Sequence, residues 1–316
     1  MANVSYHTYV NLRSKYLDDV SLVNIREVTK LKFWKNLIVF RPEIIHYFPG
    51  PTLKVLVLAK LIQLLTRSRS IISATKPVLP KLRYFKMIST FLKPDLVIVQ
   101  SKKSEGFFTA VKYKTKFVPN GVDIERFVPV SKQKKYELRK KYGLNDEDFI
   151  LLHIGPVKNG RNQKSLLHIQ DSKILLIVSL TNPSEKTAYE ELLKTDAIVW
   201  KEYFPHIEEV YSLADVYVFP VFEELNSIEI PLSVLEAMSC NLPVITTPYG
   251  ALERVLPEGD GLIFIDKPEQ IQESISMVRR DGYVINTRKK VESLSWRNIT
   301  REFSNIYDEV CKNNVV

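Results

Sequence analysis

The stretch Val216 to Thr247, VYVFPVFEELNS followed by IEIPLSVLEAMSCNLPVITT, decides how this chain folds. It predicts a buried strand, a loop, a helix that begins at Pro231 and carries Glu236, and a second apolar strand. A helix that begins just beyond the carboxyl end of a strand presents unpaired N–H groups and the positive end of its dipole, which favour an anion such as a phosphate. About one and a half turns later, Glu236 can accept hydrogen bonds from a polyol such as a ribose. The stretch therefore predicts a nucleotide site.

The length and the charge distribution of the chain predict its domain organisation. The chain has 316 residues, of which 45% are hydrophobic and 26% charged, and this predicts two globular domains. Met1 to Val128 carries 22 Lys and Arg against 8 Asp and Glu, or +14, whereas the remainder carries 23 against 28, or −5. The basic half predicts a solvated surface, a contact with anionic lipid headgroups or another anionic acceptor, or nucleic-acid binding, and these alternatives stay open.

The sequence predicts neither a membrane span nor a secretory signal. The longest apolar tract, Val55 to Leu65, is interrupted by Lys60 and Gln63 and is shorter than the ~20 apolar residues that a span requires. The N-terminus has no apolar run after a basic start. Cys240 and Cys311 lack metal-ligand spacing, so we expect free thiols. A cytoplasmic location, at the membrane surface if the basic half binds lipid, is the resulting expectation.

Both halves predict open parallel sheets covered by helices, since apolar runs alternate with helical patterns. In the first half the predicted strands are Leu37 to Phe40, Ile44 to Tyr47, Ile71 to Ala74 and Leu96 to Gln100, and the helices are Leu53 to Leu65 and Leu82 to Leu92. In the second half the predicted strands are Ile150 to Ile154, Ile174 to Ser179, Ala197 to Trp200, Val216 to Phe219, Val244 to Thr246 and Leu262 to Phe264. The helices there are Glu185 to Lys194, Ile207 to Leu213 and Pro268 to Arg279.

The junction between the halves is VPNGVDIERFVPV, Val118 to Val130. Its Asn-Gly pair predicts a turn, and Asp123 predicts a cap for a short helix from Ile124 to Phe127. A basic helix from Tyr136 to Tyr142 follows and ends at Gly143. The predicted division is an N-terminal domain of residues 1–130, a C-terminal domain of residues 131–294, and an amphipathic C-terminal helix within residues 295–316. Whether that helix packs back on the first domain stays open.

Several motifs in order resemble the retaining family-4 glycosyltransferases of the GT-B fold. Val118 to Val130 resembles their interdomain signature, PNGVD…F.P, and FP…E.PLSVLEAM…N.PVITT resembles their donor-binding signature. The supporting matches are EVYSLADVYVFP, RPEIIHYFPGP, KPDLVIVQSKKSEGF and the terminal SW…YDEV. The resemblance implies two Rossmann-like α/β domains facing across a cleft, with the N-terminal one shortened. It places a nucleotide-sugar donor mainly on the C-terminal domain and the acceptor on the N-terminal one.

The resemblance also assigns donor contacts around the helix start. Glu236 matches the second Glu of the family's E-x7-E motif, which resembles a ribose-binding carboxylate. The first Glu would fall at Ile228, so either Glu229 supplies it after a local shift or the contact with the donor sugar is lost. The seven-residue spacing puts Glu229 and Glu236 on one face if both are helical. The expected donor contacts here are Ser227, Ile228, Glu229, the amides of Ile230 and Leu232, and Glu236.

A basic loop, His153 to Ser165, follows the first strand of the second domain. Family members carry Arg directly after the Gly and Lys some residues later, which clamp the donor diphosphate. Pro156 occupies the first of these places here, while Lys158 and Arg161 are available. A cation there would stabilise charge that grows on the leaving diphosphate; the alternative is a solvated basic loop. Gly155 is expected to allow a close backbone approach.

Other positions match the family less well. Trp200, Lys201 and Tyr203 follow a strand where the family contacts the base, although ordinary core or surface aromatics explain them equally. The first 36 residues contain no Gly, so the family's N-terminal Gly-rich loop is missing. Where the family carries a His, this chain reads ATKP with Lys76. His46, at the end of another strand, either faces the cleft as a catalytic residue or is structural.

The expected reaction is transfer of a hexosyl group from a UDP- or GDP-linked sugar to a glycan, a lipid-linked or another hydroxyl acceptor, with retention and without metal or cofactor. The catalytic candidates are Glu229, Arg161, Lys158, His46 and Lys76. The Asp-x-Asp pair, Asp146 and Asp148, precedes the first strand of the second domain and is interpreted as a solvated turn. A second hypothesis is a catalytically degenerate binding or scaffold protein. Nucleic-acid binding is a third hypothesis, for which the sequence contains no matching motif.

Overall fold

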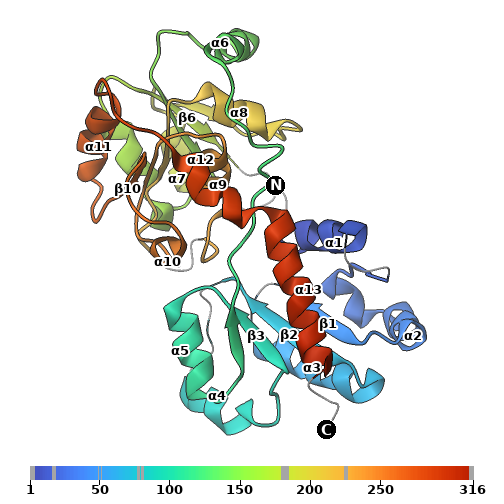
Figure 1. Cartoon of the computed structure of the whole chain (residues 1–316). Helices are drawn as coiled ribbons and strands as arrows, with labels where there is room; N and C mark the ends of the chain where they lie inside the picture. Colours follow the sequence, from blue (N-terminus) through green and yellow to red (C-terminus); the bar gives the residue numbers. More distant parts are fainter. Residues whose placement is uncertain are drawn as a thin grey trace. The chain divides into compact units, whose positions relative to one another are not determined.

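The structure is a computed structural model that describes residues 4–15, 19–48, 50, 52–76, 79, 82–178, 185–223 and 227–312. It consists of two compact units (Figure 1). The N-terminal unit includes the chain up to Gly121 together with the helix that begins at Trp296, and the C-terminal unit runs from Val122 to Ser295. Within the described residues, no helix is both long and apolar enough to cross a membrane. Cys240 and Cys311 are free thiols.

The C-terminal unit begins earlier than the boundary predicted at Val130. The division falls between Gly121 and Val122, because Val122 and Phe127 are both buried in the core of the C-terminal unit. The predicted short helix in this segment is a turn instead. Asp123 caps it as expected, since its carboxylate accepts hydrogen bonds from the N–H groups two and three residues later, at 3.3 and 3.0 Å.

The N-terminal unit is built on a four-stranded parallel sheet in the order β1-β2-β3-β4. Its strands are β1 (Ile44–Tyr47), β2 (Arg69–Ala74), β3 (Leu96–Val99) and β4 (Thr115–Phe117). Its helices are α1 (Val4–Lys15), η1 (Ile25–Thr29), α2 (Leu31–Phe40), α3 (Leu53–Thr66), α4 (Leu82–Ser89), α5 (Lys102–Ala110) and α13 (Trp296–Lys312). The sheet is short, and its strands follow one another in chain order without a reversal.

One strand prediction in this unit was wrong. Leu37 to Phe40 forms the second half of α2 and not a strand. A four-residue apolar run cannot by itself be distinguished from a piece of helix. Leu31 and Trp34 precede Ile38 at helical spacings, so the apolar pattern of a helix begins before the run. The helix ends only at Arg41, which adopts a left-handed conformation.

The helix α13 packs against the sheet of the N-terminal unit through His46. The imidazole Nδ1 lies 2.7 Å from the Tyr307 hydroxyl, and Nε2 lies 2.7 Å from Ser73 Oγ. The ring also packs against Phe303, with 5.3 Å between centroids. The predicted apolar face of this helix is buried at Ile299, Phe303 and Ile306. The last helix is therefore an integral part of the N-terminal unit.

The C-terminal unit contains a six-stranded parallel sheet in the order β10-β9-β8-β5-β6-β7. Its strands are β5 (Ile150–Ile154), β6 (Lys173–Ile177), β7 (Ile198–Trp200), β8 (Val216–Phe219), β9 (Val244–Thr246) and β10 (Leu262–Phe264), all within two residues of the predicted bounds. Its helices are α6 (Lys132–Lys141), η2 (Asn159–Arg161), η3 (Gln163–His168), α7 (Lys186–Leu192), α8 (Ile207–Leu213), α9 (Leu232–Ser239), α10 (Leu252–Val255), α11 (Gln270–Val278), α12 (Thr287–Val291) and η4 (Glu292–Leu294). Ser179, where the predicted strand of β6 ended, lies outside the described residues.

Both faces of this sheet are covered, as the continuous apolar strands predicted. Leu152 lies in a core on one face with Tyr211 and Leu235 from α8 and α9. Leu151, its neighbour in β5, lies in a second core on the other face with Ile275 from α11. Successive strand residues point to opposite faces, so a strand that is buried on both sides must be apolar throughout.

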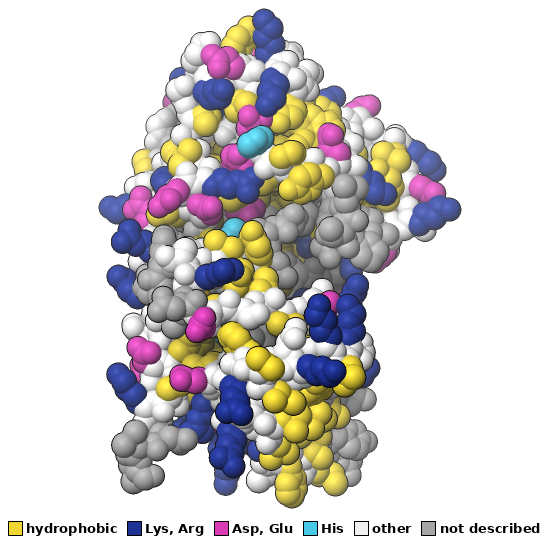
Figure 2. Space-filling model, turned by 90° about the vertical axis from the view of Figure 1, so that its right-hand side faces the viewer, with side chains coloured by type: hydrophobic (Ala, Val, Ile, Leu, Met, Phe, Trp, Pro, Cys, Tyr) yellow, Lys and Arg dark blue, Asp and Glu magenta, His cyan; other side chains and the backbone are white. Residues whose placement is uncertain are grey.

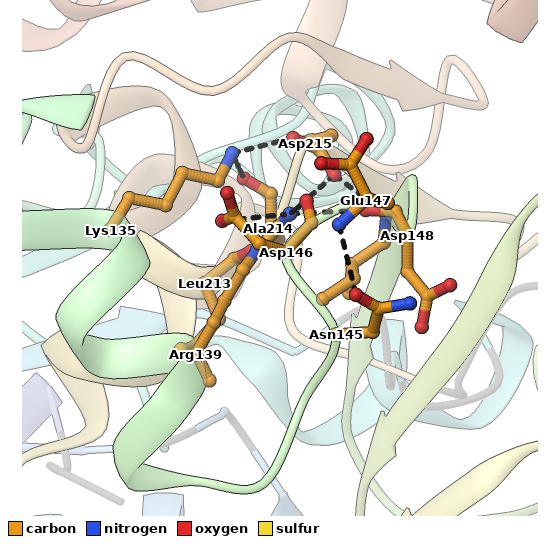
Figure 3. A network of polar contacts seen from close by, with 10 residues as sticks. Lys135, Arg139, Asn145, Asp146, Glu147, Asp148, Leu213, Ala214 and Asp215 are labelled. Atoms are coloured by element: carbon orange, nitrogen blue, oxygen red, sulfur yellow. Dashed lines mark hydrogen bonds and ion pairs between the residues drawn. The ribbon is translucent and has the colours of Figure 1, made fainter. Parts of the chain in front are cut away.

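The Asp146–Asp148 turn holds a buried arginine and is more than a solvated turn (Figure 3). Arg139 is 4% exposed and donates hydrogen bonds to the carbonyl oxygens of Asp146 and Asp148, at 2.6 and 3.1 Å. It also donates to Asp215 Oδ2 at 2.7 Å, and Lys135 Nζ lies 2.6 Å from Asp215 Oδ1. These contacts join α6 to the amino ends of β5 and β8, at the opposite edge of the sheet from the expected donor site.

The half-buried His46 predicts a pH dependence of stability. Burial lowers its pKa to about 3 from the ordinary value of 6.5, so below pH 6.5 the unfolded chain binds a proton that the folded one does not. The free energy of unfolding therefore falls as pH falls from 6.5 towards 3. His46→Asn should make this slope shallower by up to about 1.4 kcal/mol per pH unit. Denaturant titrations between pH 7 and 5 measure the slope.

The matched control is His168→Asn, because the His168 side chain is exposed. This variant should keep the wild-type slope. Equal slopes for wild type and His46→Asn would show that His46 does not control the acid sensitivity.

Candidate active site

The C-terminal unit has one point, between β5 and β8, where the direction of its strand order reverses. From β5 the chain proceeds outward to β6 and β7 and then returns to place β8 on the other side of β5. The connections that leave the carboxyl ends of such neighbouring strands diverge, which opens a crevice where ligands bind in open α/β sheets. Gly155 follows β5, and the segment that leads to α9 follows β8.

Arg161 lies at this edge, held by the loop that follows β5. It ends η2 and is 4% exposed. Its guanidinium carbon lies 5.3 Å from the centroid of the Phe219 ring, at the end of β8. A Cβ atom added to Gly155 would lie 2.5 Å from Arg161 Nη2, so the glycine is required for the close packing of the guanidinium on the backbone. Burial lowers the pKa of Arg161, but arginine remains a cation at neutral pH.

The strand residue His153 stands beside this cation and was not among the predicted site residues. Its Nδ1 lies 2.8 Å from the carbonyl oxygen of Val218, which ties β5 to β8. Burial, assisted by the positive charge of Arg161, lowers the pKa of His153 to about 3. The imidazole is therefore neutral at pH 7, and Arg161 supplies the positive charge at this point. No signal in the sequence marks His153, because its partner Val218 lies 65 residues away in the chain.

Gln163 fixes the loop that carries Lys158. Its Nε2 donates to the carbonyl oxygen of Pro156 at 2.7 Å, and its Oε1 accepts from the Lys158 N–H at 3.3 Å. Gln163 is itself buried. Lys158 is extended and partly buried. The proline that replaces the family's arginine thus takes part in the loop through its carbonyl group, which any residue could provide.

Tyr249, also missed in the sequence, holds the segment before α9. Its hydroxyl accepts a hydrogen bond from the Ser227 N–H at 2.9 Å and lies 3.0 Å from the Ser227 carbonyl oxygen, to which it can donate. Its ring packs edge-on against Phe219 with 5.8 Å between centroids. The N–H of Ala251 donates to the Glu229 carbonyl oxygen at 2.8 Å. The loop after β9 therefore positions the loop after β8.

The helix α9 begins at Leu232, with Pro231 as its N-cap and without a side-chain cap. Glu236 lies on this helix, where its Oε2 accepts a hydrogen bond from the Tyr211 hydroxyl at 2.6 Å. Burial raises the pKa of Glu236, and this hydrogen bond opposes the rise. Tyr211 fixes one carboxylate oxygen and so orients the other.

Glu229 does not lie on the helix, so it does not share a helical face with Glu236. It is buried and stands in the bend before α9. The premise that both carboxylates are helical was wrong, because α9 begins only at Leu232, three residues after Glu229. Ile228 is partly buried and Ile230 fully buried, so the side chain of Ile230 belongs to the core and only its backbone can serve a ligand.

The residues predicted for base recognition lie apart from this cluster. β7 is the edge strand of the sheet, two positions from β5. Trp200 packs against Tyr142 and Phe204, each with 5.6 Å between centroids. The Lys201 ammonium lies 4.6 Å from the Tyr189 ring, and Tyr203 is exposed. Trp200 thus has a packing role, and base contacts by these residues stay a prediction.

The two predicted residues of the N-terminal unit differ in their environment. Lys76 follows β2 and is exposed. Both ring nitrogens of His46 are engaged within the unit, by Ser73 and Tyr307. A histidine held in this way links the sheet to α13 and has no nitrogen left for an acceptor hydroxyl, so these contacts favour the structural alternative.

Comparison with known proteins identifies the C-terminal region. A family model described as glycosyl transferases group 1 matches residues 151–281. Alpha-galactosylglucosyldiacylglycerol synthase of Streptococcus pneumoniae is 27% identical over 205 residues, which cover 60% of this chain and 51% of that protein. The putative glycosyltransferase YtcC of Bacillus subtilis is 27% identical over 267 residues, covering 74% and 62%. The chain thus matches about half to three-fifths of the length of these relatives.

Solved structures show the same fold. HepE of Anabaena, crystallised in complex with UDP, has a TM-score of 0.75 at 14% identity, covering 98% of this chain and 96% of HepE. Sucrose-phosphate synthase of Thermosynechococcus elongatus has a TM-score of 0.70 at 19% identity, covering 93% and 82%. Region 151–281 therefore belongs to the glycosyl transferases group 1, and the chain has the fold of the GT-B glycosyltransferases.

Proposed function

We propose that this protein transfers a hexosyl group from a nucleotide diphosphate sugar to a hydroxyl acceptor, with retention at the anomeric carbon and without a metal ion. The observation that carries this proposal is the buried Arg161, packed between Gly155 and Phe219 at the point of strand reversal. A buried cation at the carboxyl edge of such a sheet suits the diphosphate of the donor. The complex of the structural relative HepE with UDP supports a UDP-linked donor.

In this proposal the C-terminal unit holds the donor by its two ends. Arg161 and Lys158 bind the diphosphate, together with the amides of Ile230 and Leu232, where the dipole of α9 favours negative charge. Glu236 accepts hydrogen bonds from the ribose, oriented by the Tyr211 hydroxyl. Ser227, Ile228 and Glu229 line the donor sugar through the segment that Tyr249 holds.

Arg161 then acts during transfer itself. The bond from the anomeric carbon to the diphosphate oxygen breaks, and the bond to the acceptor oxygen forms on the same face. The acceptor proton moves to the departing diphosphate oxygen. Negative charge grows on the diphosphate in this step, and a fixed guanidinium stabilises it more in the transition state than in the bound donor.

Replacing the proposed ribose carboxylate should abolish most donor binding. Glu236→Ala should weaken binding of UDP or GDP about 10- to 100-fold, since hydrogen bonds to a charged group contribute about 1.5–3 kcal/mol. Differential scanning fluorimetry with UDP and GDP across a concentration series measures the affinity, because a ligand of the native state raises Tm. Glu273→Ala on the exposed side of α11 is the matched control and should keep the wild-type shift. An undiminished shift in Glu236→Ala would remove the ribose role.

The acceptor is proposed to be a glycan or a lipid-linked hydroxyl, and the protein is proposed to work at the cytoplasmic membrane surface. The alpha-galactosylglucosyldiacylglycerol synthase relative has a lipid product in its name, and the N-terminal half of this chain is basic. Transfer to diacylglycerol glycolipids and to soluble oligosaccharides, assayed side by side, separates the two acceptor classes.

A second candidate is a binding or scaffold protein that has lost turnover. Two residues favour it: Ile228 and Pro156 stand where the family carries a Glu and an Arg. Turnover and Tm measurements with a panel of UDP- and GDP-sugars distinguish the enzyme from the scaffold protein. An enzyme transfers or slowly hydrolyses one donor, whereas a scaffold shows a Tm shift with a nucleotide and no turnover of any donor.

A further inference from the structure

The helix α2 is apolar, yet none of its residues is buried. Val39 is 83% exposed, Leu31 71% and Ile38 52%. A helix of ten residues is marginal in water by itself, and helices in globular proteins normally bury their apolar side. Among the described residues nothing covers this side, so α2 has an exposed apolar surface.

The neighbouring helix α3 extends the same surface. Its residues Leu56, Ala59 and Ile62 are buried, whereas the positions at spacings of three and four on its other side are exposed. We define the α2–α3 surface by its exposed apolar residues, which are Leu31, Ile38, Val39, Phe40, Leu53, Val57, Leu61, Leu64 and Leu65. Figure 2, which views the molecule from the side of α2 and α3, shows hydrophobic side chains gathered in the lower part beside Lys and Arg side chains.

A groove joins the two helices at their carboxyl ends. It has a volume of about 320 Å³ and is lined by Ile38, Arg41, Leu65, Thr66 and Arg67. Arg41 and Arg67 each end their helix in a left-handed conformation, with φ of 47° and 59°, where glycine is the usual residue. Both arginines are exposed, and no ion pair of either is found within the described residues. The groove therefore combines apolar walls with two guanidinium groups at its rim.

The charge around this surface selects its partner. The sequence from Lys30 to Arg67 contains seven Lys or Arg and a single acidic residue, Glu43. A second copy of this chain would bring two such basic rims together, which is unfavourable. An apolar helical surface with a basic rim is the pattern of helices that lie in the interface of an anionic bilayer.

We propose that the α2–α3 surface docks on an anionic lipid bilayer. The exposed side chains of α2 and α3 enter the boundary between headgroups and acyl chains, and Arg41 and Arg67 bind the phosphate of a lipid whose chains lie against Ile38 and Leu65. Guanidinium groups suit phosphate because they donate two parallel hydrogen bonds. This surface is separate from the donor site, so the inference stands whether or not the protein turns over a sugar.

Vesicle sedimentation tests the proposal. The full chain is mixed with vesicles of phosphatidylcholine alone or with about one-third phosphatidylglycerol, at low and at physiological salt. Wild type should bind the anionic vesicles, more tightly at low salt, and the neutral vesicles far less. The double substitution Arg41→Gln and Arg67→Gln should weaken anionic binding about 30-fold, at roughly a tenfold effect or less for each charge near the surface. Val39→Asp with Leu64→Asp should weaken it by at least as much.

Matched variants separate the surface from a general loss of charge or fold. Lys132→Gln with Lys140→Gln removes two exposed charges from α6, which belongs to the C-terminal unit, and should bind within about threefold of wild type. Every variant should keep the Tm and the UDP response of wild type, which reports on the other unit.

Four results would overturn the assignment. The first is a wild type that binds no vesicle at low salt, and the second is an arginine variant that binds as wild type does. The third is that inorganic phosphate alone protects Arg41 and Arg67 from an arginine-modifying reagent as well as anionic vesicles do. That result would assign the groove to free phosphate. The fourth is a dimer in sedimentation velocity that Leu64→Asp dissociates, which would assign the surface to a second copy.

Discussion

Arg161→Met should lower kcat for donor turnover by about 10²- to 10³-fold, the usual effect of removing one fixed group that stabilises developing negative charge. Methionine preserves most of the volume between Gly155 and Phe219, where the guanidinium packs at 5.3 Å from the ring centroid. KM should change far less, because the negative charge that Arg161 stabilises is greatest in the transition state. The assay uses the donor sugar that raises the Tm of wild type most.

Two further variants test whether the position of the guanidinium matters. Gly155→Ala places a methyl group 2.5 Å from the present position of Arg161 Nη2. It should displace the cation and reduce kcat on the order of 10- to 100-fold without removing any charge. Arg280→Met, at an exposed position, is the control and should leave kcat and KM unchanged. A kcat within threefold of wild type in Arg161→Met, accompanied by a lower Tm, would show that this arginine only supports the fold.

Arg139→Leu should destabilise the C-terminal unit by about 3–5 kcal/mol, the usual result of breaking a buried ion pair from one side. The substitution leaves the Asp215 carboxylate without its Arg139 partner, and it removes the donors to the carbonyl oxygens of Leu213, Asp146 and Asp148 (Figure 3). Lys135 still contacts Asp215, so some compensation is retained. Activity should fall only as far as the folded fraction does.

The unfolding of the C-terminal unit can be measured separately from that of the N-terminal unit. The chain has 3 tryptophans, and Trp200 alone lies between Val122 and Ser295. In a background with Trp34→Phe and Trp296→Phe, urea titration followed by fluorescence therefore reports on the C-terminal unit. Lys140→Leu on the exposed side of the same helix should change the free energy of unfolding by no more than about 0.5 kcal/mol. A loss below about 1 kcal/mol for Arg139→Leu would show that the network contributes little to stability.

Periodicity predicted most of the C-terminal unit, and its failures have local causes. Continuous apolar runs located β5 to β10, because a strand covered on both faces has no place for polar residues. The same signal failed at Leu37–Phe40, where the run is the exposed end of a helix. Burial is what distinguishes the two cases, and a short apolar run does not encode its own burial.

Only some residues of the candidate site have a signal in the sequence. The turn at Gly155, the basic residues after it and the helix with Glu236 have signals in the order of residues along the chain. Tyr249 and His153 have no such signal, because their partners lie 22 and 65 residues away in the chain. Contacts of this kind arise only when the loops after β8 and β9, or the strands β5 and β8, are placed side by side.

The amino-acid sequence by itself determined the alternation of strands and helices and the cation at Arg161, because these depend on local pattern and on the choice of residue. Tertiary structure alone decided which of the predicted groups are tied into the fold. It tied both nitrogens of His46 to Ser73 and Tyr307. It also brought the carbonyl oxygens of Asp146 and Asp148 within hydrogen-bond distance of the Arg139 guanidinium. It also left α2 without a buried residue. The physical reason is that burial and hydrogen-bond partners are properties of neighbours in space, which residues distant in sequence provide.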